Sequence, residues 1–390
     1  MKSSANNETG SDRLAELDVL RGVAVLMVLW HHADHFEAAI AKFPLWLWRV
    51  LTYSQTGGWS GVDLFFVLSG FLVSGLLFRE YLRYGTIGYL RFYIRRGLKI
   101  YPAFYVMLAT TVLVLLCQAK PFPWQPFISE ALYIQSYFEG LWGHTWSLAV
   151  EEHFYLCLPL ILFMAGRMSN GKSRANAFHR LPFIFVIAAL AILCLRTWAV
   201  AHHLTKHSLW RVYFMTHTRL DALLFGVCIS WLHHFHPQIL VRWVSRRRFL
   251  QLAFATACVL PPFIPRVTNV YNYSIGLTLN YIGYGLFLTH FIYWSSPIKD
   301  RLLKRLPLLR NIGKYSYSIY LWHVPLLAWW LPWLAIWIQN PALYFMVGCS
   351  AYLTGSVAIG ILASKLIEFP VLHIRDRIFP SRCGPLTGLR

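Results

Sequence analysis

Charged residues are scarce in this chain of 390 residues. Asp, Glu, Lys and Arg make up 13% of it, whereas soluble domains carry about 25%. Apolar residues account for 57%, and there are 17 tryptophans. This balance excludes an ordinary soluble protein and is typical of an integral membrane protein. The net charge is +20, and the basic residues that cause it lie between apolar runs. This distribution argues against a nucleic-acid-binding protein.

The cysteines do not indicate a functional site. The seven cysteines include no CxxC pair, and an odd number with this spacing fits small apolar core residues better than a disulfide framework or metal site. The polar N-terminal stretch lacks the small-residue cleavage pattern of a signal peptide after its apolar run. We therefore expect residues 19–36 to be a retained helix. No linker, soluble domain or repeat between the two halves is visible.

Long apolar runs, in contrast, are abundant. A helix that crosses the ~30 Å hydrocarbon core needs about 20 mostly apolar residues. Ten such runs occur, at about 17–36, 59–78, 100–118, 144–165, 181–201, 219–235, 249–265, 275–295, 315–338 and 342–367. We predict an all-α integral membrane fold with about ten transmembrane helices. The expected domains are a tail (1–16), a transmembrane domain (17–372) and a second tail (373–390).

The loops differ strongly in their basic residues. With the N-terminus inside, the cytoplasmic segments hold 27 Lys and Arg and the opposite loops hold 6. Cytoplasmic loops of membrane proteins carry such an excess. We therefore predict that both termini are cytoplasmic.

The first apolar run, LRGVAVLMVLWHHADHF (20–36), carries ionisable residues that are expensive inside a membrane, at roughly 2.5–3.5 kcal/mol each on insertion scales. Arg21 and His32 differ by about 20° around a helix, and His35 lies within about 40° of Arg21. A polar stripe therefore runs along one face of this helix. His31, His32, Asp34 and His35 could also bind a metal, but the sequence holds no HExxH motif or second ligand cluster. We expect no metal site.

Three further runs place polar residues at a similar depth. Asp63 lies near the outer end of the second run, Glu151 and Glu152 in the outer half of the fourth, and Arg219 and Asp221 at the start of the sixth. One interpretation is mutual pairing that fixes helix packing. The other is a functional site, which the whole set favours because ionisable residues in membranes usually mark one.

The stretch RFYIRRGLKIYP (91–102) differs, because it places Arg91, Arg95, Arg96 and Lys99 at the predicted cytoplasmic end. A simple positive-inside loop would explain them. The sharper hypothesis is a phosphate-binding clamp, since guanidinium groups bind phosphate in bidentate fashion.

Several motifs together resemble the acyltransferase-three family of bacterial membrane enzymes, which includes O-antigen O-acetylases and nodulation-factor acetyltransferases. They are LDVLRGVAVLMVLWHH, GWSGVDLFFVLSGFL, RRGLKIYP, HTWSLAVEEHFYL, TRLDALLFG, YSYSIYLWH and KLIEFP. The resemblance implies transfer of an acyl group, commonly acetyl, from cytoplasmic acetyl-CoA to a hydroxyl of an extracytoplasmic sugar. It also implies that His32 is the key catalytic residue and that Arg95 or Arg96 binds CoA. Lys99 stands where the family has a second Arg, and His153 where it often has Gln.

We therefore predict a multi-pass O-acyltransferase of the bacterial inner membrane, with acetyl-CoA as donor and a carbohydrate or lipid-linked glycan as acceptor. Its oligomeric state is left open. His32 would be the base or acyl carrier, oriented by Asp63 or Glu151. Predicted donor-binding residues are Arg21, Arg95, Arg96 and Lys99; predicted acceptor-site residues are His35, Glu152, Arg219, Asp221 and His323. The alternative is a proton-coupled transporter, although such proteins typically show inverted repeats.

Overall fold

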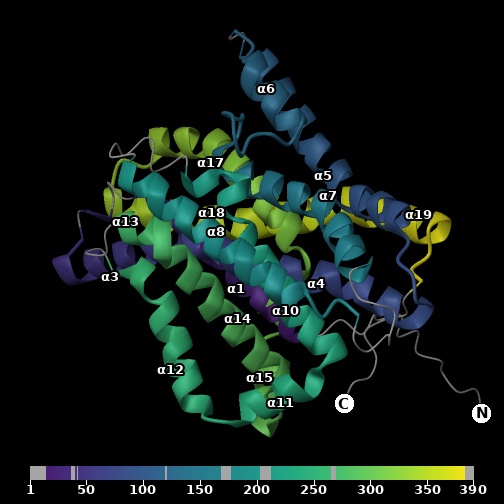
Figure 1. The fold of residues 1–390 in the computed structure, drawn as a ribbon. Helices are drawn as coiled ribbons and strands as arrows, with labels where there is room; N and C mark the ends of the chain where they lie inside the picture. Colours follow the sequence, from purple (N-terminus) through teal and green to yellow (C-terminus); the bar gives the residue numbers. More distant parts are fainter. Residues whose placement is uncertain are drawn as a thin grey trace, which may run out of the picture.

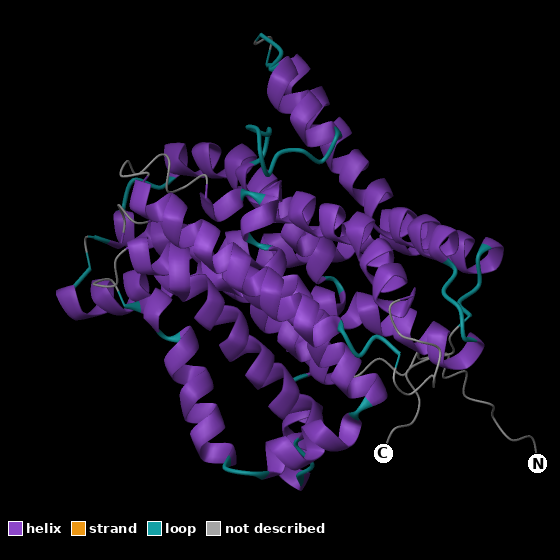
Figure 2. Cartoon of the chain, in the orientation of Figure 1, coloured by secondary structure: helices purple, strands orange, loops and turns teal. Residues whose placement is uncertain are grey.

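The computed structural model describes residues 15–36, 40–41, 43–118, 121–167, 177–202, 212–264 and 269–382. In these ranges the chain forms helices, turns and loops but no strand, as Figure 2 shows. The predicted all-α fold is therefore confirmed. Most of the long helices gather in one bundle, from which α6 projects at one end (Figure 1).

Each predicted span coincides with a helix. In chain order these are α1 (Ala15–His31), α4 (Gly61–Tyr84), α5 (Tyr89–Cys117), α7 (Trp146–Arg167), α8 (Leu181–His202), α10 (Leu220–Phe235), α12 (Arg248–Val259), α14 (Leu277–Tyr293), α17 (Ser316–Trp337) and α18 (Pro341–Ala363).

Not all ten of these helices are long enough to cross a membrane alone. Within the described ranges, the stretches that contain α4, α5, α7, α8, α14, α17 and α18 are long and apolar enough to do so. The remaining three helices are shorter. Helix α1 has 17 residues, α10 has 16 and α12 has 12. The protein is thus a multi-pass membrane protein, and its exact number of crossings stays a prediction.

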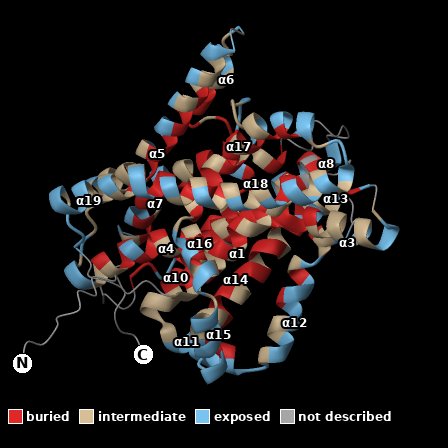
Figure 3. Ribbon diagram, turned by 180° about the vertical axis from the view of Figure 1, so that it is seen from behind, coloured by how far each residue is buried: buried red, intermediate tan, exposed pale blue. Residues whose placement is uncertain are grey.

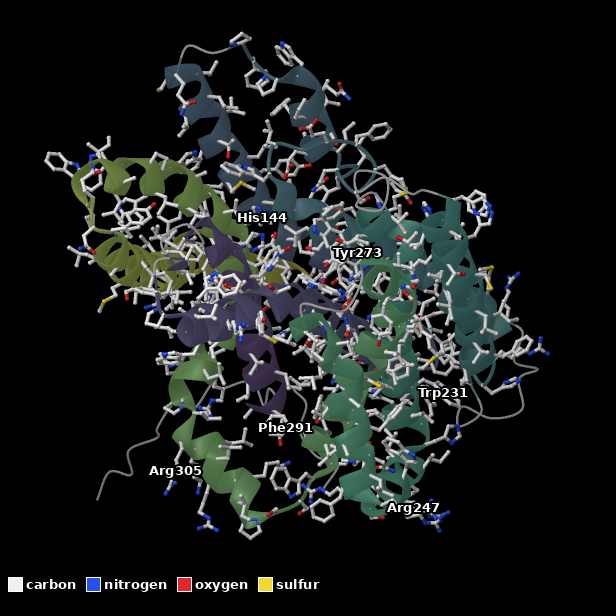
Figure 4. The ribbon with its side chains drawn as sticks, turned by 90° about the vertical axis from the view of Figure 1, so that its left-hand side faces the viewer. His144, Trp231, Arg247, Tyr273, Phe291 and Arg305 are labelled. Atoms are coloured by element: carbon white, nitrogen blue, oxygen red, sulfur yellow. The ribbon has the colours of Figure 1, made fainter. Side chains whose placement is uncertain are left out.

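Shorter helices occupy the predicted loops and the C-terminal region. They are α3 (Leu45–Thr56), α6 (Trp124–Ala131), α11 (Pro237–Ser245), α15 (Pro297–Arg305), α16 (Pro307–Lys314) and α19 (Phe369–Ile378). Helices α11, α15 and α16 start at prolines, because the first helical turn tolerates the missing N–H. Arg247 and Arg305, from two of the arginine-rich loops, lie at the same end of the molecule, away from His144 (Figure 4).

Helix α1 lies in the centre of the bundle, against α4, α16 and α17, where buried residues concentrate (Figure 3). The crossing of α4 with α10 depends on two glycines. A Cβ on Gly70 of α4 would lie 2.0 Å from the carbonyl oxygen of Leu223, and one on Gly226 of α10 would lie 2.2 Å from that of Val67. Small residues allow such close approach of membrane helices. This crossing fixes α4, which carries much of the site, against α10.

Candidate functional site

A cavity of about 1210 Å³ lies between α1, α4, α5, α7, α17 and the segment that begins with α19. Along α4 its lining extends from Val62 to Glu80, which corresponds to about 27 Å at the rise of an α-helix. Its volume lies slightly above the range of about 300–1,000 Å³ that is usual for pockets that bind small molecules. The cavity is therefore long enough for an extended ligand.

The cavity gathers most of the cations that the sequence singled out. Its basic lining residues are Arg21, Arg79, Arg91, Arg95, Arg96, Lys99, Lys314, Arg375 and Arg382, and its acidic ones are Glu80, Glu151, Glu152, Glu368 and Asp376. Helix α5 begins at Tyr89 rather than near residue 100, so Arg91 to Lys99 lie on a helix instead of a loop. The four predicted donor-binding residues thus line one cavity.

Glu151 belongs to the wall of this cavity. One carboxylate oxygen accepts a hydrogen bond from the Ser69 hydroxyl at 2.8 Å, and the other accepts one from the Tyr155 hydroxyl at 2.7 Å. The Arg96 guanidinium lies 3.9 Å from the centre of the Tyr155 ring and 4.0 Å from Glu151. These partners hold Glu151 in the wall of the cavity, bonded to groups other than His32.

Three histidines from different helices meet at the centre of the bundle. The Nε2 atom of His323, in α17, lies 3.4 Å from Nδ1 of His32. The ring of His144, just before α7, lies 4.8 Å from the ring of His323. His144 and His323 are almost fully buried. His144 was missed by the sequence reasoning, although it opens the motif HTWSLAVEEHFYL.

The hydrogen bonds of these histidines define their neutral tautomers. Nδ1 of His32 lies 2.9 Å from the carbonyl oxygen of Val28, and Nδ1 of His323 lies 2.5 Å from that of Tyr320. A carbonyl oxygen only accepts, so each Nδ1 carries the proton. Nε2 of His323 then carries a lone pair 3.4 Å from the same nitrogen of His32, and His32 carries its own lone pair on Nε2. This is the arrangement that a general base requires.

Tyr320 connects the histidines to the cavity. Its side chain lines the cavity, and its ring lies 5.5 Å from His144 and 5.4 Å from His323. Its hydroxyl donates to the carbonyl oxygen of His144 at 2.6 Å, and Ser147 lies 2.6 Å from the same hydroxyl. One layer of side chains therefore separates the end of the cavity from the histidines.

Asp63 and Arg219 form a buried ion pair. Their closest nitrogen and oxygen atoms are 2.5 Å apart, and each side chain is about 1% exposed. Asn280 donates a second hydrogen bond to Asp63 at 3.3 Å, and the Arg219 guanidinium lies 4.6 Å from the Tyr213 ring centre. The carboxylate is thus bonded to groups other than His32.

A second buried pair joins Asp221 to Arg196, at 2.7 Å. Arg196 also donates to the carbonyl oxygen of Thr218 and to the hydroxyl of Thr278. In the described part of the chain, the lining of the cavity includes neither of these two ion pairs. Their geometry corresponds to the pairing interpretation of the sequence.

The remaining candidates are distributed as follows. Glu152 lines the cavity beside Glu151. Arg21 lines it as well and lies 3.8 Å from Asp18. The side chain of His35 lies outside the described residues. In the described ranges, no group of three or more His, Cys, Asp or Glu residues is placed to hold a metal ion.

Comparison with known proteins identifies the family of the chain. The model of a family described as "Acyltransferase domain" matches residues 14–361. The chain belongs to the acyltransferase-three family. It is 31% identical over 339 residues to O-acetyltransferase OatA of Staphylococcus aureus and 32% identical over 336 residues to the putative O-acetyltransferase SACOL0978 of the same species.

Both alignments cover 80% of this chain and 50% of the relative. This member of the family therefore spans about half the length of the curated relatives that it matches. No solved structure matches the chain.

Proposed function

We propose that this family member is an O-acetyltransferase of a bacterial plasma (inner) membrane. It transfers acetyl from cytoplasmic acetyl-CoA to a hydroxyl of an extracytoplasmic carbohydrate or glycolipid. The observation that carries this proposal is the long basic cavity whose lining residue Tyr320 contacts His144 and His323, the second of which lies against His32. The names of the relatives, all O-acetyltransferases, support acetyl as the group transferred.

The chemistry of the cavity suits coenzyme A. Its diphosphate and 3′-phosphate are anions, and arginines bind phosphate through short, charge-assisted and often bidentate hydrogen bonds. Arg91, Arg95, Arg96 and Lys99 supply these donors from one helix. The pantetheine arm then extends along α4 towards Val62 and Tyr320, which places the thioester near the histidines.

In this proposal, Nε2 of His32 removes the proton of the acceptor hydroxyl. The resulting oxygen attacks the thioester carbonyl carbon, the carbon–sulfur bond breaks, and the proton passes from His32 to the thiolate of CoA. Nδ1 of His32 lies 2.9 Å from the carbonyl oxygen of Val28 and 3.4 Å from Nε2 of His323, so both groups are placed to orient the ring, and His323 is the side chain placed to stabilise its protonated form. The structure favours His323 over Asp63 or Glu151 for this role, because both carboxylates are bonded to other groups.

A test follows with inside-out membrane vesicles and acetyl-CoA labelled in its acetyl group. The variants are His32→Ala and, as a matched control, His202→Ala, which removes an exposed histidine of α8. We expect label in a glycan or glycolipid fraction for the native chain and the control, and a loss of about 10²–10⁴-fold for His32→Ala.

Two results would contradict the proposal. Equal labelling by His32→Ala would remove this residue from the chemistry. Failure of the native protein to bind CoA, combined with proton-dependent flux of a solute across the vesicle membrane, would favour the transporter alternative. Recovery of an acetylated His32 peptide after quenching would instead identify a covalent carrier role.

A further inference from the structure

The chain turns back onto α5 directly after α19 (Figure 1). We call residues 375–382, which are the last turn of α19 and the segment after it, the C-terminal strap. Arg91 donates a hydrogen bond to the carbonyl oxygen of Pro380, and Arg95 donates one to that of Phe379. Arg95 also forms an ion pair with Asp376 at 2.9 Å. The strap therefore binds two of the four basic residues Arg91, Arg95, Arg96 and Lys99 of α5.

The far end of the strap is also held. The carbonyl oxygen of Arg382 accepts hydrogen bonds from the Tyr84 hydroxyl at 2.9 Å and from Arg83 at 3.3 Å. The Arg382 guanidinium forms an ion pair with Glu80 at 3.3 Å. The strap lines the cavity through residues that include Arg375, Asp376 and Arg382. It therefore lies across the basic end of the cavity.

Like a phosphate, the strap offers oxygen acceptors to the guanidinium groups, but most of these oxygens are uncharged. Two neutral carbonyl oxygens and one carboxylate occupy guanidinium groups that can each bind a phosphate in bidentate fashion. The Asp376 side chain is 52% exposed, and exposed ion pairs contribute little. A ligand with several phosphate charges thus has the advantage over the strap for the same donors.

We propose that the C-terminal strap is an internal substitute for the donor phosphates, which displace it from Arg91 and Arg95 when acyl-CoA binds. This inference rests on the proposed function and adds a regulatory element to its donor site. The donor phosphates can bind only when the strap is open. The apparent affinity for the donor is therefore the intrinsic affinity multiplied by the fraction of molecules with an open strap. Weakening the strap therefore strengthens donor binding.

The first test measures dissociation constants of the purified full-length protein for CoA, dephospho-CoA and 3′,5′-ADP. Asp376→Asn is expected to tighten CoA binding by about two- to five-fold, the range that exposed ion pairs contribute. Asp376→Glu keeps the charge and leaves binding unchanged. Asp300→Asn, which alters an exposed acid in α15, is the control for net charge. If dephospho-CoA binds equally well to the native protein and Asp376→Asn, the strap competes with the 3′-phosphate.

The second test follows the strap itself. A Ser381→Cys variant that also carries Cys383→Ser is treated with maleimide, and labelling at position 381 is measured by peptide mass spectrometry. CoA is expected to raise the labelling rate, and Asp376→Asn to raise it without CoA. Unchanged or slower labelling with CoA, or weaker CoA binding by Asp376→Asn, would overturn the proposal. If the native protein bound none of the three nucleotides, the proposed function itself would fail instead.

Discussion

The buried ion pair between Asp63 and Arg219 gives a decisive prediction about which polar groups hold the bundle together. Asp63 lies in the first turn of α4 and Arg219 directly before α10. Both side chains are about 1% exposed, and they meet at 2.5 Å. Removing one partner of such a pair leaves a buried charge without compensation, which costs about 3–5 kcal/mol.

We expect Arg219→Met to lose about this much stability. For a chain of this length, the loss corresponds to a fall in the unfolding temperature of about 4–6 °C. The double variant Asp63→Asn/Arg219→Met removes both charges, and Asn280 remains to bond the new amide. Replacing both partners of a buried pair by neutral residues is often close to neutral, so the double variant should be more stable than Arg219→Met alone.

The assay is a double-mutant cycle. Unfolding of the purified proteins in detergent is followed by tryptophan fluorescence, and acetyl transfer is measured well below the unfolding temperatures. A coupling energy of about 0.5–3 kcal/mol, with turnover retained in the double variant, would support a structural role. Complete loss of turnover in a double variant that unfolds near the native temperature would refute this reasoning and return Asp63 to the catalytic centre.

Two further predictions concern His323 and Glu130. His323→Ala should lower kcat for acetyl transfer, by less than His32→Ala does, while KM for acetyl-CoA stays unchanged, because His323 acts through His32; an altered KM with normal kcat would contradict this role. Glu130, in the predicted outer connection, is fully buried, and burial raises its pKa to about 7. The folded state thus holds a proton that the unfolded state has released, so this contribution to stability is lost as the pH rises towards 7. Glu130→Gln should therefore gain stability relative to the native protein as the pH rises from about 4.5 to about 7, and a constant difference in unfolding temperature over this range would contradict the prediction.

Much of the fold follows from local sequence. Apolar runs of about 20 residues must form helices in a membrane, because every backbone N–H and C=O needs an internal partner there. All ten predicted runs therefore coincide with helices. The start of α5 was misplaced by about eleven residues, because the charges of RFYIRRGLK ended the apolar run without ending the helix. Helix formation depends on backbone hydrogen bonds, and hydropathy detects only the part that lies in lipid.

The sequence also singled out several polar residues that the structure brings together. The cations of RRGLK line one cavity, as predicted, but Glu151 and Glu152, which were predicted to lie at the depth of His32, line the same cavity. The grouping within each set was accessible from sequence because each set lies within one or two turns of a single helix.

Only the tertiary structure decided how residues from different helices pair. Asp63 meets Arg219 rather than His32, Asp221 meets Arg196, and His323 approaches His32 across 291 positions of sequence. Depth in the membrane limits which groups can meet, but the choice among them depends on which helices are neighbours and how each is rotated. Close crossings such as that of Gly70 and Gly226 fix those neighbours. The sequence alone therefore determined the helices and the chemistry they carry, and packing between helices determined the site.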